Sequence, residues 1–283
     1  MVSTSRNWQS IWEETIRRSS FNNMRSDLSE KDRLNLSAES WYKHYDSKQS
    51  QDDPQRKHML EEEMNRLRRF ISKDSSVLDI GAGFGRLAVP LTREVRRLTA
   101  IEPAGAYRNA MKERAAREGV RNMEFSEDLW AEFPLHDKYD LVYSTWSGAV
   151  KDPESLMKMH EASQGYCVLE LGASPSKEGD FDKIYTMIMG DELRYPGNYL
   201  NILTTLYDYE IYANLETWGY DTVTKYQTIE DAVELRKNGL EAYTQVTDEM
   251  IEQLRQFFRA KMNPDGTYTT RAKGVSCMLW WKV

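Results

Sequence analysis

The chain has 283 residues, of which 40% are hydrophobic, 11% aromatic and 29% charged, a composition typical of a globular protein with a sizeable core. Its 38 basic and 45 acidic residues leave a net charge of −7, which removes the general electrostatic attraction on which most nucleic-acid binding depends. We therefore expect neither a disordered nor a fibrous protein, and no nucleic-acid partner.

In chain order, the hydrophobic pattern first predicts helices and then an alternation of strands with helices. Residues 1–54 are predicted as a helical segment or lid, and an amphipathic helix follows at 60–71. The alternation beyond it predicts a Rossmann-like, doubly wound, mostly parallel α/β sheet. The strands are expected at 76–80, 97–102, 122–126, 139–144 and 165–171, and the helices at 84–94, 104–118 and 152–162.

The alternation breaks after residue 171. A segment rich in tyrosine and methionine, 172–220, is expected as an inserted cap that selects the substrate, within a domain spanning 55–283. Two helices are predicted beyond it, at 228–239 and 247–262. A final strand is expected near 273–282.

The two cysteines and the N-terminal residues indicate the cellular compartment of the protein. Cys167 and Cys277 lie in apolar runs without metal-ligand spacing, as expected of buried thiols in a reducing compartment. Residues 1–14 lack the apolar region of a secretory signal, and no run approaches the ~20 apolar residues of a membrane span. The sequence thus predicts a cytoplasmic protein with no metal site and no membrane contact, and it gives no indication of oligomeric state.

A glycine-rich run, SVLDIGAGFGR at 76–86, lies between a predicted strand and a predicted helix, the place of a nucleotide-binding turn. Glu102, at the end of the next strand, suits a bidentate contact with two ribose hydroxyls. The dinucleotide fingerprint is GxGxxG, whereas here the third glycine comes one residue earlier, and Asp79 stands two residues before the first. A carboxylate there is a poor neighbour for pyrophosphate and a good one for an amino-acid ammonium group. The pattern therefore favours S-adenosylmethionine over NAD.

In this motif the sequence resembles the class I S-adenosylmethionine-dependent methyltransferases, whose first motif reads D/E-x-G-x-G-x-G after a hydrophobic strand. The resemblance covers roughly 74–171 and implies a seven-stranded sheet with an antiparallel last strand, and S-adenosylhomocysteine as the product. The loops after the second, third and fourth strands are implied to complete the cofactor site. The residues assigned to that site are Asp79, Gly81, Ala82, Gly83, Gly85, Glu102, Pro103, Asp128, Leu129 and Ser144.

Candidate substrate contacts are chosen by position. Trp146 follows the fourth strand, where members of the resembled family often place substrate-facing residues, and Glu170 ends an apolar strand. Tyr42 and Tyr45 belong to an aromatic N-terminal run of the kind that often folds over the cofactor in that family. Arg194, in the tyrosine-rich segment, suits an acidic substituent.

These features predict methyl transfer to a small or medium-sized molecule by in-line displacement, which needs no nucleophile on the enzyme. No catalytic base is identified. The alternatives that stay open are a non-catalytic S-adenosylmethionine-binding protein, a methyltransferase acting on protein or RNA, and an NAD-dependent oxidoreductase. The run RLRR, at 66–69, is the clearest basic candidate for RNA, although such a helix face is usually solvated.

Overall fold

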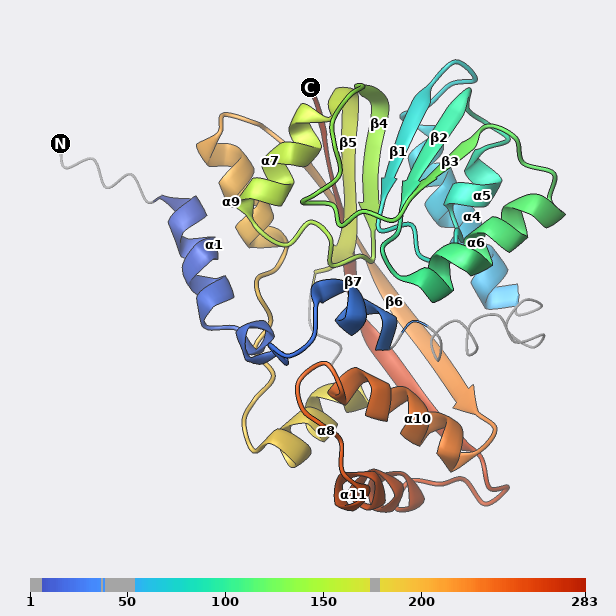
Figure 1. The fold of residues 1–283 in the computed structure, drawn as a ribbon, viewed down its shortest axis with the longest axis vertical. Coiled ribbons are helices and arrows are strands. Elements are labelled where there is room, and N and C mark those ends of the chain that lie inside the picture. Colours follow the sequence, from blue (N-terminus) through green and yellow to red (C-terminus); the bar gives the residue numbers. More distant parts are fainter. Residues whose placement is uncertain (1–6, 37, 39–53, 174–178) are drawn as a thin grey trace.

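The computed structural model describes residues 7–36, 38, 54–173 and 179–283, and its centre is a seven-stranded sheet (Figure 1). The order is β3-β2-β1-β4-β5-β7-β6, parallel from β3 to β5, with β7 antiparallel to both of its neighbours. The predicted sheet, mostly parallel with an antiparallel last strand, is confirmed. The strands are β1 (Ser76–Ile80), β2 (Arg97–Ile101), β3 (Met123–Ser126), β4 (Tyr139–Thr145), β5 (Ser163–Gly172), β6 (Asn214–Tyr226) and β7 (Tyr268–Lys282).

Helices cover both faces of this sheet because its parallel strands are apolar on both sides; β1 is buried at every position. One face packs against α4, α5 and α6, through residues such as Met64 and Met111. The other face packs against α1, α7 and α9, through Trp12, Leu156 and Leu206. The helices are α1 (Trp8–Arg17), η1 (Ser20–Asn23), α4 (Pro54–Arg68), α5 (Ala88–Leu91), α6 (Gly105–Arg117), α7 (Pro153–Glu161), α8 (Asp180–Met189), α9 (Tyr199–Asp208), α10 (Ile229–Leu240) and α11 (Asp248–Arg259).

A third group of buried residues lies apart from the sheet and joins α8, α10 and α11 to the far ends of β6 and β7. These two strands pair without interruption from Asn214↔Trp280 to Tyr226↔Tyr268, whereas β5 accompanies β7 only as far as Ser276. The two strands therefore leave the sheet as a ribbon, beyond the carboxyl end of β5 (Figure 1). We call α8, α10, α11 and this ribbon (220–226 and 268–274) the cap.

Several elements differ from their predicted positions. The segment 172–220 is divided, because α8 joins the cap, α9 packs on the sheet and β6 already begins at Asn214. The last strand begins at Tyr268 rather than near 273. The helix predicted at 84–94 is reduced to α5, which has four residues, since the glycine turn continues into it and Pro90 cannot donate a backbone hydrogen bond.

The N-terminal segment connects the sheet to the cap. α1 lies along α9, and Trp12 Nε1 donates to the Pro196 carbonyl at 3.0 Å. Ser20 N then donates to the Arg194 carbonyl at 2.8 Å, and Arg25 N donates to the Ala242 carbonyl, next to α10, at 2.9 Å. A short helix follows at 30–36.

The predicted lid therefore contains helices in its described part. Tyr42 and Tyr45 lie outside the described residues. None of the described helices has the length and apolar character needed to cross a bilayer.

Candidate functional site

The glycine turn joins the carboxyl end of β1 to α5, and each of its glycines has a backbone conformation that other residues rarely adopt. The φ angles of Gly81, Gly83 and Gly85 are +76°, +57° and +75°. A Cβ on Gly85 would lie 2.6 Å from Met111 Cγ, so α6 can pack closely only because this side chain is absent. A Cβ on Gly83 would meet no atom of the described residues within 4 Å, so these residues leave open space above the middle of the turn.

The backbone of the turn is held by the end of β2. Gly81 N and Ala82 N both donate to the Ile101 carbonyl, at 2.9 and 3.0 Å. The turn is therefore held in place by hydrogen bonds within the protein itself.

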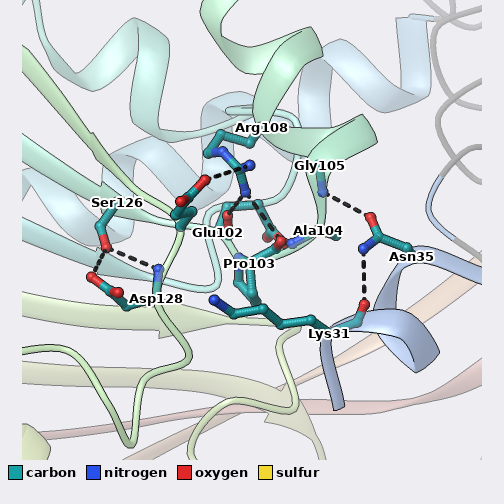
Figure 2. A network of polar contacts seen from close by, with 10 residues as sticks. Lys31, Asn35, Glu102, Pro103, Ala104, Gly105, Arg108, Ser126 and Asp128 are labelled. Carbon is teal, nitrogen blue, oxygen red and sulfur yellow. Dashed lines mark hydrogen bonds and ion pairs between the residues drawn. The ribbon is translucent and has the colours of Figure 1, made fainter. Parts of the chain in front are cut away.

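Glu102 links the glycine turn to the start of α6. Its Oε2 accepts a hydrogen bond from Gly83 N and its Oε1 accepts one from Ala104 N, both at 2.8 Å. The side chain is buried, and burial raises the pKa of Glu102, against the lowering effect of these two N–H groups. Arg108 donates to the carbonyls of Glu102 and Pro103, at 2.9 and 3.1 Å, and so fixes the same loop from α6 (Figure 2).

Asp79 lies beneath the turn, on the face of β1 that packs toward α4. Its carboxylate accepts a hydrogen bond from the Tyr143 hydroxyl at 2.6 Å, and the residue is 3% exposed. Burial raises the pKa of Asp79 to about 7, helped by the nearby charge of Glu102 and opposed by Tyr143 and Arg86. A nearby cation would therefore stabilise the ionised form of the Asp79 carboxylate.

Asp128 forms the far wall of the site, after β3. Ser126 Oγ donates to Asp128 Oδ2 at 2.6 Å and accepts from Asp128 N at 3.1 Å, a local arrangement that fixes the start of the loop. Leu129, the next residue, is half-buried, and its carbonyl accepts from Phe133 N. Figure 2 shows Asp128 on the opposite side of the same space from Glu102 and Pro103.

Ser144, predicted as a cofactor contact, is buried where β4 meets the end of β1. It is 2% exposed, and its hydroxyl donates to the Ile80 carbonyl at 2.8 Å. The side chain therefore ties β4 to the end of β1, next to the glycine turn.

Trp146 and Glu170 lie together at the carboxyl ends of β4 and β5. Trp146 N donates to the Glu170 carbonyl at 2.9 Å, and Trp146 has a φ of +52°. This conformation turns its indole outward, where it is 51% exposed and meets the Tyr220 ring edge-on at 6.5 Å. The Glu170 carboxylate is buried instead and pairs with Arg66 of α4 at 3.2 Å.

Four charged residues form what we call the α4 ion-pair cluster. They are Glu63, Arg66, Arg86 and Glu170: Glu63 pairs with Arg86 of the glycine turn, and Arg66 pairs with Glu170. The Arg66 guanidinium also lies 4.0 Å from the ring centre of Trp218, and its buried Nε has no hydrogen-bond partner among the residues that the structure describes. Burial and the charge of Glu63 raise the pKa of Glu170 to about 7, against the attraction of Arg66. The cluster binds α4 to both the glycine turn and β5.

No sequence pattern indicates this cluster or the Tyr143 hydrogen bond to Asp79. Glu63 and Arg66 stand three residues apart on α4, the spacing of one helix face, but their partners are far away in the chain. Arg194 is not part of the site that Glu102 and Asp79 form. Its guanidinium forms a surface ion pair with Asp191.

A pocket of about 580 Å³ lies beside this site. It is lined from β2, α6, β3, the loop before β4 and the start of β4. It shares Ser126 and Asp128 with the far wall of the site, and its lining includes no residue of the glycine turn. Within the described residues, no cluster of three or more His, Cys, Asp or Glu side chains is arranged to hold a metal ion.

The region around this site matches known proteins. Residues 77–164 match a family model described as "Methyltransferase domain". One curated relative, a probable ribosomal RNA small subunit methyltransferase A of Methanosphaera stadtmanae, is 31% identical over 70 residues. That match covers 24% of this chain and spans only 26% of the relative's length.

Solved structures share the fold at low identity. The YcgJ protein of Bacillus subtilis superposes with a TM-score of 0.56 and 13% identity, covering 80% of this chain and 99% of that one. The magnesium protoporphyrin IX methyltransferase of Synechocystis, solved with bound S-adenosylhomocysteine, gives a TM-score of 0.54 and 12% identity. That alignment covers 87% of this chain and 96% of the other. The overall fold is therefore that of this group of structures.

Proposed function

We propose that this chain, which carries a class I methyltransferase domain, transfers a methyl group from S-adenosylmethionine to a small or medium-sized molecule. The observation that carries the proposal is the pair of buried carboxylates, Asp79 and Glu102, on either side of a glycine turn with open space above Gly83. A dinucleotide pyrophosphate at the turn would be repelled by Asp79, whereas Glu102 suits the ribose of either cofactor. A cofactor with an ammonium group and a ribose suits both.

The residues present fit such a cofactor. Glu102, held by Gly83 N and Ala104 N, presents a fixed carboxylate to ribose hydroxyls, since each carboxylate oxygen can accept more than one hydrogen bond. Asp79 would hold the ammonium group, whose positive charge favours the ionised acid. The loop that contains Asp128 and Leu129 would line one side of the adenine. Structures such as the Synechocystis methyltransferase, solved with S-adenosylhomocysteine, support the same cofactor.

The bound sulfonium supplies an activated methyl group, and the protein's part is to align the acceptor with it and to exclude water. Trp146 is the proposed acceptor-facing residue, because its outward indole stands at the carboxyl end of β4 and contacts Tyr220 at the base of the cap. Glu170 is a weaker candidate than its position in the sequence indicates, since its carboxylate is buried against Arg66.

A small molecule is favoured over RNA by the charges on α4. Each arginine of the RLRR run has an acidic partner: Arg66 pairs with Glu170, Arg68 with Glu94, and Arg69 with Glu216. Paired arginines offer little attraction to phosphate groups. The curated relative, named as a probable ribosomal RNA methyltransferase, matches over only 70 residues, and the Synechocystis structure belongs to an enzyme named for a porphyrin.

The test is calorimetric titration of the purified protein with S-adenosylmethionine, S-adenosylhomocysteine and NAD in parallel. Micromolar binding of the first two with no NAD signal is expected, and binding of NAD alone would refute the proposal. Transfer of a labelled methyl group to acceptors from a small-molecule library then separates an enzyme from a non-catalytic binding protein. Labelling of RNA but of no small molecule would favour the alternative acceptor.

A further inference from the structure

The helix at 30–36 lies at the carboxyl ends of the parallel strands, beside the candidate site. Its first turn is stabilised by a capping box, in which Asp32 N donates to Ser29 Oγ at 3.1 Å and Ser29 N donates to Asp32 Oδ2 at 3.3 Å. The residues just before it reach the cap through the Arg25 hydrogen bond to the Ala242 carbonyl. The helix thus lies between the cap and the loops that form the candidate site.

Two contacts fix this helix to the methyltransferase domain. Asn35 Oδ1 accepts a hydrogen bond from Gly105 N, the first residue of α6, at 2.8 Å. Glu30, at the other end, forms an ion pair of 2.6 Å with Lys151, in the loop after β4. Both attachment points flank the candidate site, so the helix forms its outer wall.

One side chain of this helix projects into the site. Asn35 Nδ2 donates to the Lys31 carbonyl at 2.9 Å, and the Lys31 side chain extends from there into the space between Pro103 and Asp128 (Figure 2). Within the described part of the chain, the Lys31 ammonium has no hydrogen-bond or ion-pair partner. Lys31 is half-buried, and an ammonium with three donors and no partner among the described residues is a candidate for a ligand contact.

We infer that Lys31 is a cofactor-binding residue that donates a hydrogen bond to the adenosine half of S-adenosylmethionine, with Asn35 holding its helix in place. This inference rests on the proposed function. The two carboxylates of Glu102 and Asp128 offset the lysine charge at this end of the site, whereas an ammonium beside the sulfonium would meet repulsion. Lys31 therefore belongs with the ribose and adenine rather than with the methionine half.

The test compares two ligands and four proteins by calorimetry. The ligands are S-adenosylhomocysteine and 5′-methylthioadenosine, which keeps the adenosine but lacks the amino-acid group. The proteins are the wild type, Lys31→Met, Lys31→Arg and, as a matched control on the exposed surface of α8, Lys183→Met. Thermal melting of each variant shows whether it is folded.

We expect Lys31→Met to weaken both ligands by the same factor, about five- to tenfold, as for the loss of one charge-assisted hydrogen bond. Lys31→Arg should restore most of the affinity, and Lys183→Met should match the wild type. Wild-type affinity in folded Lys31→Met would overturn the inference, as would a loss limited to S-adenosylhomocysteine. If the wild type binds neither ligand, the proposed function itself fails, an outcome distinct from both.

Discussion

The buried Asp79 carboxylate should make the protein less stable as the pH rises from 4 to 8. Burial raises its pKa from 3.8 to about 7, so over this interval the folded state retains a proton that the unfolded chain releases. The unfolding free energy therefore falls with increasing pH. At 1.36 kcal/mol for each pH unit, the interval gives a loss of about 4 kcal/mol, complete above pH 7.

Asp79→Asn removes this titration while keeping an oxygen that can accept the Tyr143 hydrogen bond. Urea unfolding at pH 4, 5, 6, 7 and 8 should give similar stabilities for wild type and variant at pH 4. At pH 8 the variant should be more stable, by about 4 kcal/mol at most. Parallel pH profiles for the two proteins would refute the reasoning.

Asp140→Asn is a control of opposite sign. Although burial acts to raise it, the pKa of Asp140 is lowered overall by hydrogen bonds from Ser76, whose N and Oγ donate at 2.7 and 2.9 Å, and from Gln164. The ionised form is therefore the favoured one in the folded state. The wild type should lose stability relative to Asp140→Asn as the pH falls through the acidic range, the reverse of the Asp79 result.

Three further predictions concern the turn and its surroundings. Glu102→Ala should weaken S-adenosylhomocysteine binding by about 1–3 kcal/mol in calorimetry, and unchanged affinity in a folded variant would remove Glu102 from the site. Gly85→Ala should lower the free energy of unfolding, measured in urea, by about 2–5 kcal/mol, because backbone strain and a clash with α6 combine. Gly83→Ala should lower it by only about 1–2 kcal/mol, since only the strain applies there. Equal losses in the two variants would contradict this account. Arg66→Leu should destabilise the fold by about 3–5 kcal/mol by leaving Glu170 buried without its partner, and adding Glu170→Gln should recover much of the loss in thermal melts. No recovery in the double variant would show that Arg66 acts through packing on α4 alone.

The part of the site that the sequence predicted depends on local rules. A strand, three glycines and a helix in succession define the turn through backbone conformation alone, and the glycines indeed have positive φ. Glu102 was predicted as a site residue because it stands at the end of the next strand. Trp146 was found at the expected strand end for the same reason.

The rest of the site depends on contacts between segments that are distant in the chain, and a hydrophobic pattern does not predict such contacts. Tyr143 reaches Asp79 across 64 residues, and Arg66 reaches Glu170 across 104. The cap is built from α8, α10 and α11, whose apolar faces have the same periodicity as helices that pack on the sheet. Lys31 lies in a short polar helix, and nothing in its spacing indicates that its side chain enters the site.

The ribbon that carries the cap also determines how the cap can move. β7 loses β5 as its partner beyond Ser276, and at the base of the ribbon β6 and β7 contain Gly219 and Gly274 in adjacent pairs. A two-stranded ribbon with a glycine on each strand resists stretching but twists and bends easily. Any motion of the cap is therefore expected to be a swing about this pair of glycines, in which α8, α10 and α11 move together.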